Sequence, residues 1–136
     1  MSFRIPTALL FLLAACASAE PAATITPEAL AARIADGSAP LVLDVRTQAE
    51  YDAGHVPGAV LIPHDQLAQR LAELGDAKDA EIVVHCQSGR RAGMAEEVLR
   101  DAGFSRVTDL EGHWQAWQAG GYPVAEPGGR QTGGSK

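Results

Sequence analysis

Cysteine is scarce in this sequence, and its scarcity excludes several kinds of site. The 136 residues contain two cysteines, Cys16 and Cys86. Cys16 lies in an apolar segment that we expect to be removed or modified, so Cys86 is the single thiol of the expected domain and has no partner for an internal disulfide. The four histidines show no ligand spacing with a second cysteine or a carboxylate, so we expect no metal site.

Basic residues are also few. Eleven Lys and Arg against 17 Asp and Glu give a formal net charge of −6. This balance argues against nucleic acid as a partner, because phosphate binding needs a basic surface. The sequence has no internal repeat of the kind that builds solenoids. Its length fits one domain with one core, and we expect that domain to be a monomer.

The apolar run 5–15 near the amino terminus is too short for a membrane-spanning helix, which needs about 20 residues. Together with the preceding Arg4 it is typical of a secretory signal, which we place at 1–19. Two ways of processing it remain open. Leu13–Cys16 resembles the lipobox of bacterial lipoproteins, whose cysteine carries the lipid, whereas Ala17–Ala19 is an A-x-A site whose cleavage after Ala19 releases a soluble chain. Both predict an exported, periplasmic domain, and the lipobox, which we favour, anchors it to a membrane.

Short apolar segments alternate with helical patterns along the rest of the chain. After a linker at 20–23, we expect strands at 41–43, 59–62, 82–84 and 105–109. We expect helices at 27–36, 47–53, 64–74, 92–102 and 114–119. Apolar strands without alternation, separated by helices, indicate an α/β domain with a parallel sheet covered on both faces, here at 24–125. The composition of 126–136 predicts a disordered tail.

The segment Cys86–Arg91 joins the third of these strands to a helix, at the sheet edge where parallel sheets bind ligands. Backbone N–H groups at such a junction converge on one point, and the helix dipole favours negative charge there. A thiolate at Cys86 is thereby favoured, which predicts a lowered pKa. Gly89 permits the turn, and Arg90 and Arg91 add positive charge. This pattern predicts a nucleophile that accepts a sulfane sulfur and passes it on, and a Cys86 sealed from solvent would contradict that prediction.

The segment Cys86–Arg91 resembles the active-site loop Cys-x-x-Gly-x-Arg of the rhodanese (thiosulfate sulfurtransferase) family in its single-domain form. Two further blocks share the resemblance, 44–63 with Asp44-Val45-Arg46 and Gly-His-Val-Pro-Gly-Ala, and 110–124 with Leu-Glu-Gly and Gly-Tyr-Pro-Val. Three ordered blocks are more specific than any one of them. The resemblance implies a three-layer fold whose five-stranded, mostly parallel sheet has helices on both faces.

The resemblance also implies an activity. Sulfur would move from thiosulfate, through a persulfide on Cys86, to cyanide or a thiol, without a cofactor. Small-molecule sulfur donors and acceptors would be the partners. The residues implied to bind the substrate are those of the loop: Gln87, Ser88, Gly89, Arg90 and Arg91.

Three residues outside the loop are candidates for the pocket. His113 stands where the resemblance implies a second glycine after Gly112, and its side chain either lines the pocket mouth, where it would alter the choice of acceptor, or points to solvent. Asp44 and Arg46 follow a strand end near the pocket. Arg46 either approaches an anionic donor or, as we favour, pairs with Glu50.

Other functions remain open beside sulfur transfer. Cysteine-dependent phosphatases and arsenate reductases use a loop Cys-x5-Arg, but their arginine would fall at position 92, which is Ala92. The shorter loop encloses a smaller space, which suits a sulfur better than a tetrahedral phosphate. A non-catalytic binding module or a redox-sensing thiol is a further alternative. The intact loop around Cys86 favours sulfur transfer over all of these.

Overall fold

A computed structural model describes residues 22–76, 78–127 and 131–132. The segment 1–19, with both predicted ways of processing it, lies outside the described residues. In the part that is described, no helix has the length and apolarity needed to cross a membrane.

A five-stranded parallel sheet forms the centre of the domain, as the sequence and the family resemblance predict. The strands stand in the order β1-β5-β4-β2-β3, and each neighbouring pair is parallel. Their bounds are Ala23–Ile25 for β1, Leu41–Asp44 for β2, Val60–Leu61 for β3, Ile82–His85 for β4 and Val107–Leu110 for β5. β4 lies in the middle of the sheet, so its carboxyl end opens between two neighbouring strands.

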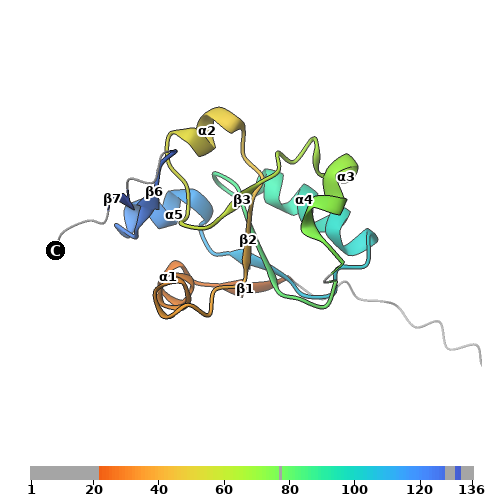
Figure 1. The fold of residues 1–136 in the computed structure, drawn as a ribbon, viewed down its shortest axis with the longest axis horizontal. Helices are drawn as coiled ribbons and strands as arrows, with labels where there is room; N and C mark the ends of the chain where they lie inside the picture. The colour runs from red at the N-terminus through yellow and green to blue at the C-terminus, as the bar shows by residue number, and fades with distance from the viewer. Residues whose placement is uncertain (1–21, 77, 128–130, 133–136) are drawn as a thin grey trace, which may run out of the picture.

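Helices cover both faces of this sheet. Their bounds are Pro27–Asp36 for α1, Gln48–Asp52 for α2, Leu67–Arg70 for α3, Leu71–Leu74 for the 3₁₀ helix η1, Arg90–Asp101 for α4 and His113–Ala119 for α5. Figure 1 shows α1 and α5 on one side of the strands and α3 and α4 on the other. Each side has its own apolar core: Leu30, Trp114 and Trp117 belong to the first, and Leu67, Ala95 and Leu99 to the second.

Local sequence signals set most of the helix ends. The Thr26 side chain accepts a hydrogen bond from the Ala29 N–H at 3.1 Å, and α1 ends at Gly37, whose φ of 81° is left-handed. Thr47 caps α2 in the same way, accepting from the Glu50 N–H at 3.2 Å. These side chains satisfy backbone donors that a helix leaves unpaired at its start.

Several predicted boundaries differ from the structure. Ala23 belongs to β1, so the predicted linker 20–23 is wrong at that residue; a three-residue edge strand carries no apolar run that would reveal it. The helix expected at 64–74 is divided into α3 and η1, and α4 begins at Arg90, two residues earlier than predicted.

The carboxyl-terminal segment also contains structure that the composition does not predict. β6 (Val124–Ala125) pairs antiparallel with β7 (Gln131–Thr132). For these last two residues the structure shows a strand where a disordered tail is predicted, whereas 128–130 and 133–136 lie outside the described residues. Ala125 also bonds to His55 through both backbone groups, which ties this end of the chain to the domain.

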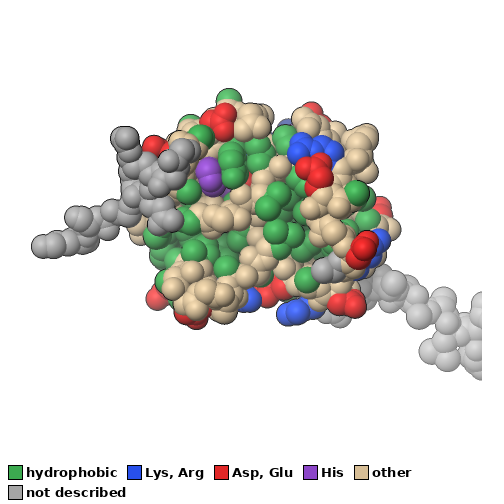
Figure 2. All heavy atoms as spheres, in the orientation of Figure 1, with side chains coloured by type: hydrophobic (Ala, Val, Ile, Leu, Met, Phe, Trp, Pro, Cys, Tyr) green, Lys and Arg blue, Asp and Glu red, His purple; other side chains and the backbone are tan. Residues whose placement is uncertain are grey.

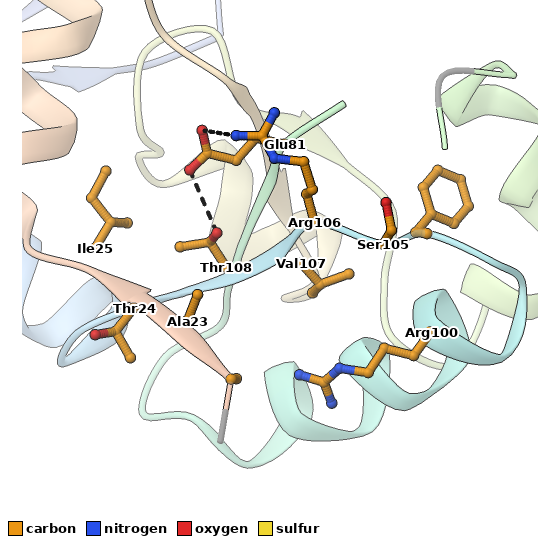
Figure 3. A pocket seen from close by; sticks show the side chains of 11 residues that line it. Ala23, Thr24, Ile25, Glu81, Arg100, Ser105, Arg106, Val107 and Thr108 are labelled. Carbon is orange, nitrogen blue, oxygen red and sulfur yellow. Dashed lines mark hydrogen bonds and ion pairs between the residues drawn. The ribbon is translucent and has the colours of Figure 1, made fainter. Parts of the chain in front are cut away.

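Figure 2 shows hydrophobic side chains in the middle of the face in view and charged side chains mainly toward its margins. A cavity of about 700 Å³ lies where β1, β4 and β5 begin, and Figure 3 shows Glu81, Arg106 and Thr108 in its lining. None of the predicted site residues lines this cavity. It lies at the amino ends of the strands, whereas ligands of parallel sheets bind at the carboxyl ends.

Candidate active site around Cys86

Cys86 follows β4 directly and begins the loop that leads into α4. Its neighbour His85 is paired in register with Asp44 of β2, and Val84 is paired with Asp109 of β5. Cys86 therefore lies at the carboxyl edge of the central strand, where the sequence predicts the site. The loop Cys86–Gly89 is short, so the sulfur and the amino terminus of α4 are close together.

A backbone amide of this loop points at the sulfur. The Gly89 N–H donates to the Cys86 Sγ at 3.0 Å. Gly89 has a φ of 122°, a conformation that side-chain-bearing residues rarely adopt, and it immediately precedes the twelve-residue helix α4. The positive end of the helix dipole is therefore beside the sulfur. The geometry includes one backbone donor of the predicted anion nest.

The sulfur is less accessible than the sequence analysis requires. Cys86 is 1% exposed, although Ser88 and Arg90 in the same loop are exposed and Gln87 and Gly89 are half-buried. The expectation of a thiol open to solvent is thus wrong for this conformation. Cys86 packs with the apolar core on the α4 side of the sheet, and its loop turns the Gly89 amide over the sulfur. A reagent can reach Sγ only when the groups that cover it move.

Arg91 lies beside the sulfur and is held by Glu50 of α2. Its two terminal nitrogens donate to the two carboxylate oxygens of Glu50, both at 2.9 Å. This pairing raises the pKa of Arg91 against the opposing effect of burial, and the charge of Cys86 adds to the increase. The same pairing holds the pKa of Glu50 below its ordinary value. The sequence analysis places Arg91 in the site but misses Glu50, although Glu50 belongs to the block 44–63 that resembles the family.

Arg46 does not pair with Glu50, so that prediction is wrong. Its guanidinium binds the Asp44 carboxylate, with Nη2 at 2.7 Å from Oδ2, and also donates to the Gly54 carbonyl at 2.8 Å. It stacks 4.4 Å from the centre of the Trp114 ring. Asp44 and Arg46 are 0% and 2% exposed. They form a buried ion pair below the site rather than a wall of the pocket.

His113 lies beneath the loop rather than at a pocket mouth. It is 6% exposed, and its Nδ1 accepts a hydrogen bond from the Cys86 N–H at 3.3 Å. Next to it, the Trp114 N–H donates to the Cys86 carbonyl at 3.0 Å and the Gln115 N–H to the Gln87 carbonyl at 3.3 Å. The first turn of α5 thus holds the Cys86 loop from below.

His85 also contacts the loop. The carbonyl of Cys86 is an acceptor, so Nδ1 of His85, at 3.1 Å, must carry the proton. Burial lowers the pKa of His85 against the attraction of Asp44, which keeps the ring neutral at ordinary pH. Among the described residues, including those of this site, no three His, Cys, Asp or Glu side chains are arranged to hold a metal ion.

Comparison with known families gives the same domain. The model of the rhodanese-like domain matches residues 26–120 of this chain. The chain belongs to the rhodanese-like domain family.

Relatives of this rhodanese-like domain include sulfurtransferases. A sulfurtransferase from Allochromatium vinosum is 36% identical over 105 residues, which cover 77% of this chain and 96% of the relative. The thiosulfate sulfurtransferase PspE of Escherichia coli K12 is 34% identical over 70 residues, covering 52% of this chain and 67% of PspE. These similarities support a rhodanese-type enzyme of the sulfurtransferase class and do not favour the phosphatase, arsenate reductase or binding-module alternatives.

Solved structures of rhodanese-like domains share the fold. A rhodanese-related protein from Thermoplasma volcanium superposes with a TM-score of 0.66 at 32% identity, covering 76% of this chain and 97% of that protein. The similarity extends over nearly the whole of that domain. The expectation of a three-layer rhodanese-like fold is therefore confirmed.

Proposed function

We propose that this rhodanese-like domain transfers a sulfane sulfur from thiosulfate, or a similar anionic donor, to a thiophilic acceptor through a persulfide on Cys86. The observation that carries the proposal is the Gly89 N–H, which donates to the Cys86 sulfur at 3.0 Å from the residue that precedes α4. A donor and a helix terminus beside the sulfur stabilise negative charge there. That is the charge of the attacking thiolate and also of the persulfide that replaces it.

In the first half-reaction, the Cys86 thiolate attacks the outer sulfur of thiosulfate. A bond forms between the two sulfur atoms, the original sulfur–sulfur bond of thiosulfate breaks, and its electron pair leaves with sulfite. The product is Cys86–S–S⁻, so no oxidant or proton is needed. We assign the sulfonate end to Arg91, because its guanidinium lies beside the sulfur and has paired donors of the kind that match two oxygens of an anion.

In the second half-reaction, a nucleophile such as cyanide attacks the terminal sulfur of the persulfide. The carbon–sulfur bond of thiocyanate forms, the persulfide bond breaks, and its electron pair returns to Cys86 as a thiolate. A thiol acceptor follows the same path, taking the sulfur as its own persulfide. The site is thereby regenerated without a cofactor.

Access to the buried sulfur requires a rearrangement, and the Arg91–Glu50 pair is the group we propose to move. Arg91 and Glu50 are 24% and 33% exposed, so solvent and an anionic donor can reach the pair. A donor anion that takes Arg91 from Glu50 uses the same two guanidinium nitrogens. Binding of the donor would then be coupled to uncovering the sulfur that attacks it.

The test of this function is the mass of the protein after incubation with thiosulfate. Wild-type protein should gain one sulfur atom on Cys86 and lose it on addition of cyanide, with thiocyanate released. Cys86→Ser should show neither event and should keep the wild-type circular dichroism spectrum, because serine is close in size to cysteine. Arg70→Ala is the control, because Arg70 pairs with Glu73 outside the loop and its loss should leave the adduct in place.

Two results would contradict the proposal. One is continued release of thiocyanate by Cys86→Ser. The other is a folded wild-type protein in which Cys86 takes no sulfur from thiosulfate, mercaptopyruvate or glutathione persulfide.

A further inference from the structure

The backbone at His113 is unusual for a residue with a side chain. Among the described residues, His113 is the one non-glycine residue with a positive φ, at 54°, and it follows Gly112, whose φ is 69°. A residue with a Cβ pays conformational energy to occupy this region. The cost is expected to persist only where the side chain has a use, and this position directs the imidazole beneath the Cys86 loop.

The imidazole contacts both ends of the loop that encloses the sulfur. Its Nδ1 accepts from the Cys86 N–H at 3.3 Å. Its Nε2 lies 2.9 Å from the point where a Cβ on Gly89 would stand. Gly89 is the residue whose amide donates to Sγ. The ring therefore fills the space below the turn, and only a glycine at position 89 leaves room for it.

A carboxylate orients the ring from its other side. Because Nδ1 is an acceptor, the proton of the neutral ring must be on Nε2. Nε2 lies 3.5 Å from the Oδ1 of Asp109 on β5. That oxygen is buried and has no hydrogen-bond partner of its own in the structure. A buried acceptor without a partner is costly, so it attracts the Nε2–H and holds the ring with Nδ1 toward Cys86.

Asp109 is in turn close to α4. Burial is the main cause that raises the pKa of Glu96. The neighbouring Asp109 raises this pKa further, while Arg100 opposes the increase. Glu96 and Arg100 pair at 3.1 Å. The titratable groups next to His113 are Asp109 from β5, His85 from β4 and Cys86 itself, while Glu96 and Arg100 of α4 lie on the far side of Asp109.

We propose that His113, oriented by Asp109, is a positioning residue for Cys86: it accepts the Cys86 N–H and supports the turn in which the Gly89 amide points at the sulfur. This inference rests on the proposed function for its purpose, but the geometry it describes concerns only the reactivity of the thiol. The family resemblance implies a glycine at this position, and a glycine has no side chain that could accept the Cys86 N–H.

The first test is the protonation of His113 in the wild-type protein. A long-range ¹⁵N–¹H spectrum of histidine-labelled protein at neutral pH should show His113 as the Nε2–H tautomer. Assignment comes from the signal that disappears in His113→Asn. A ring protonated at Nδ1, or at both nitrogens, has no acceptor for the Cys86 N–H and would overturn the proposal.

The second test is the rate at which the neutral reagent iodoacetamide alkylates Cys86. His113→Gly loses one buried hydrogen bond to the Cys86 N–H, and we expect its alkylation rate at neutral pH to be about fivefold lower than that of wild type. His113→Asn should fall closer to wild type, because asparagine tolerates a positive φ and offers an amide oxygen as acceptor. Asp109→Asn should lie between the two, since it keeps an oxygen near Nε2 but removes its charge.

The asparagine variant separates positioning from a merely structural role. Recovery of the alkylation rate in His113→Asn requires an acceptor for the Cys86 N–H, which glycine does not supply. Identical alkylation rates for wild type and His113→Gly would overturn the inference. Neither test uses a sulfur donor, so failure of wild type to accept sulfur from thiosulfate would count against the proposed function alone.

Discussion

The guanidinium of Arg91 pairs with the Glu50 carboxylate and lies beside the Cys86 sulfur. Glu50 holds it through two hydrogen bonds in the structure. If Arg91 binds an anionic sulfur donor, as we propose, that donor competes with the carboxylate, and Glu50 then affects how readily the donor binds.

Replacing Glu50 by glutamine should weaken this hold. We expect Glu50→Gln to lower the KM for thiosulfate, by at most about fivefold, the range of a partly exposed ion pair. Glutamine preserves the cap of α2, because the Thr47 hydroxyl that donates to the Glu50 carboxylate can donate to the amide oxygen of glutamine instead. Steady-state kinetics measure the change in KM. Glu73→Gln is the control, because Glu73 forms an ion pair with Arg70 and neither residue belongs to the site around Cys86. An unchanged or raised KM would contradict the competition.

The same ion pair should respond to acid. The pKa of Glu50 is lowered by Arg91, so the contribution of the pair is complete above the ordinary glutamate pKa and is lost as the pH falls through the lowered value. Wild type and Glu50→Gln should therefore differ most near neutrality and converge in acid. The measurement is the ratio of the KM values of the two proteins for thiosulfate from neutral to acid pH, and this ratio should approach one in acid.

At the scale of elements, α5 is the unexpected part of the site. Its first residues donate to the carbonyls of Cys86 and Gln87, and Gly112 begins the helix with a φ of 69°. A Cβ on Gly112 would collide with the Cβ of Ala116 in the next turn. The start of α5 is thus fixed by a residue that cannot carry a side chain, and the loop above it depends on that start.

Gly112→Ala should damage the site through this helix. We expect a loss of unfolding free energy above the roughly 1–2 kcal/mol of the left-handed backbone alone, because the collision adds to it, together with slower alkylation of Cys86. Gly121→Ala is a close control, since Gly121 has a φ of 68° and nothing within 4 Å of its Cβ position. It should lose stability without changing Cys86. Denaturant unfolding and alkylation rates measure both, and equal effects of the two variants would count against the role of α5.

The elements that sequence patterns predict are those whose own residues determine them. β2 and β4 each begin with three apolar residues, and α1 has a threonine cap and a terminal glycine. β1 was missed because two of its three residues are exposed and its place is given by pairing with β5. In the same way the loop sequence locates Cys86, but the contacts of Glu50 with Arg91 and of His113 with Cys86 join residues 41 and 27 positions apart. A local sequence pattern covers only neighbouring residues, so it cannot predict contacts between residues this far apart in the chain.

Considered as a whole, the molecule supports its site with a buried ion pair. Asp44 and Arg46 lie between β2, α2 and α5, where Arg46 contacts both Gly54 and Trp114. Both charges are buried, so each depends on the other for its solvation. The pair links the two blocks of sequence on either side of Cys86 and makes the stability of the domain sensitive to one arginine.

Arg46→Ala should therefore strongly destabilise the domain. Removing one partner of a buried pair leaves an unpaired charge and is expected to cost about 3–5 kcal/mol of unfolding free energy. Arg70→Ala is the matched control, because its pair with Glu73 is on the surface and should contribute less than about 1 kcal/mol. Urea unfolding compares the two. A loss for Arg46→Ala no larger than that for Arg70→Ala would contradict the account.

The docking of α5 under the Cys86 loop also orders events in time. The segment that supports the loop is made about thirty residues after the cysteine, so a chain still being synthesised has the thiol but lacks the α5 amides and the imidazole that contact its loop. Under the proposed function, the complete support of the sulfur is therefore in place only once the last helix of the domain has folded.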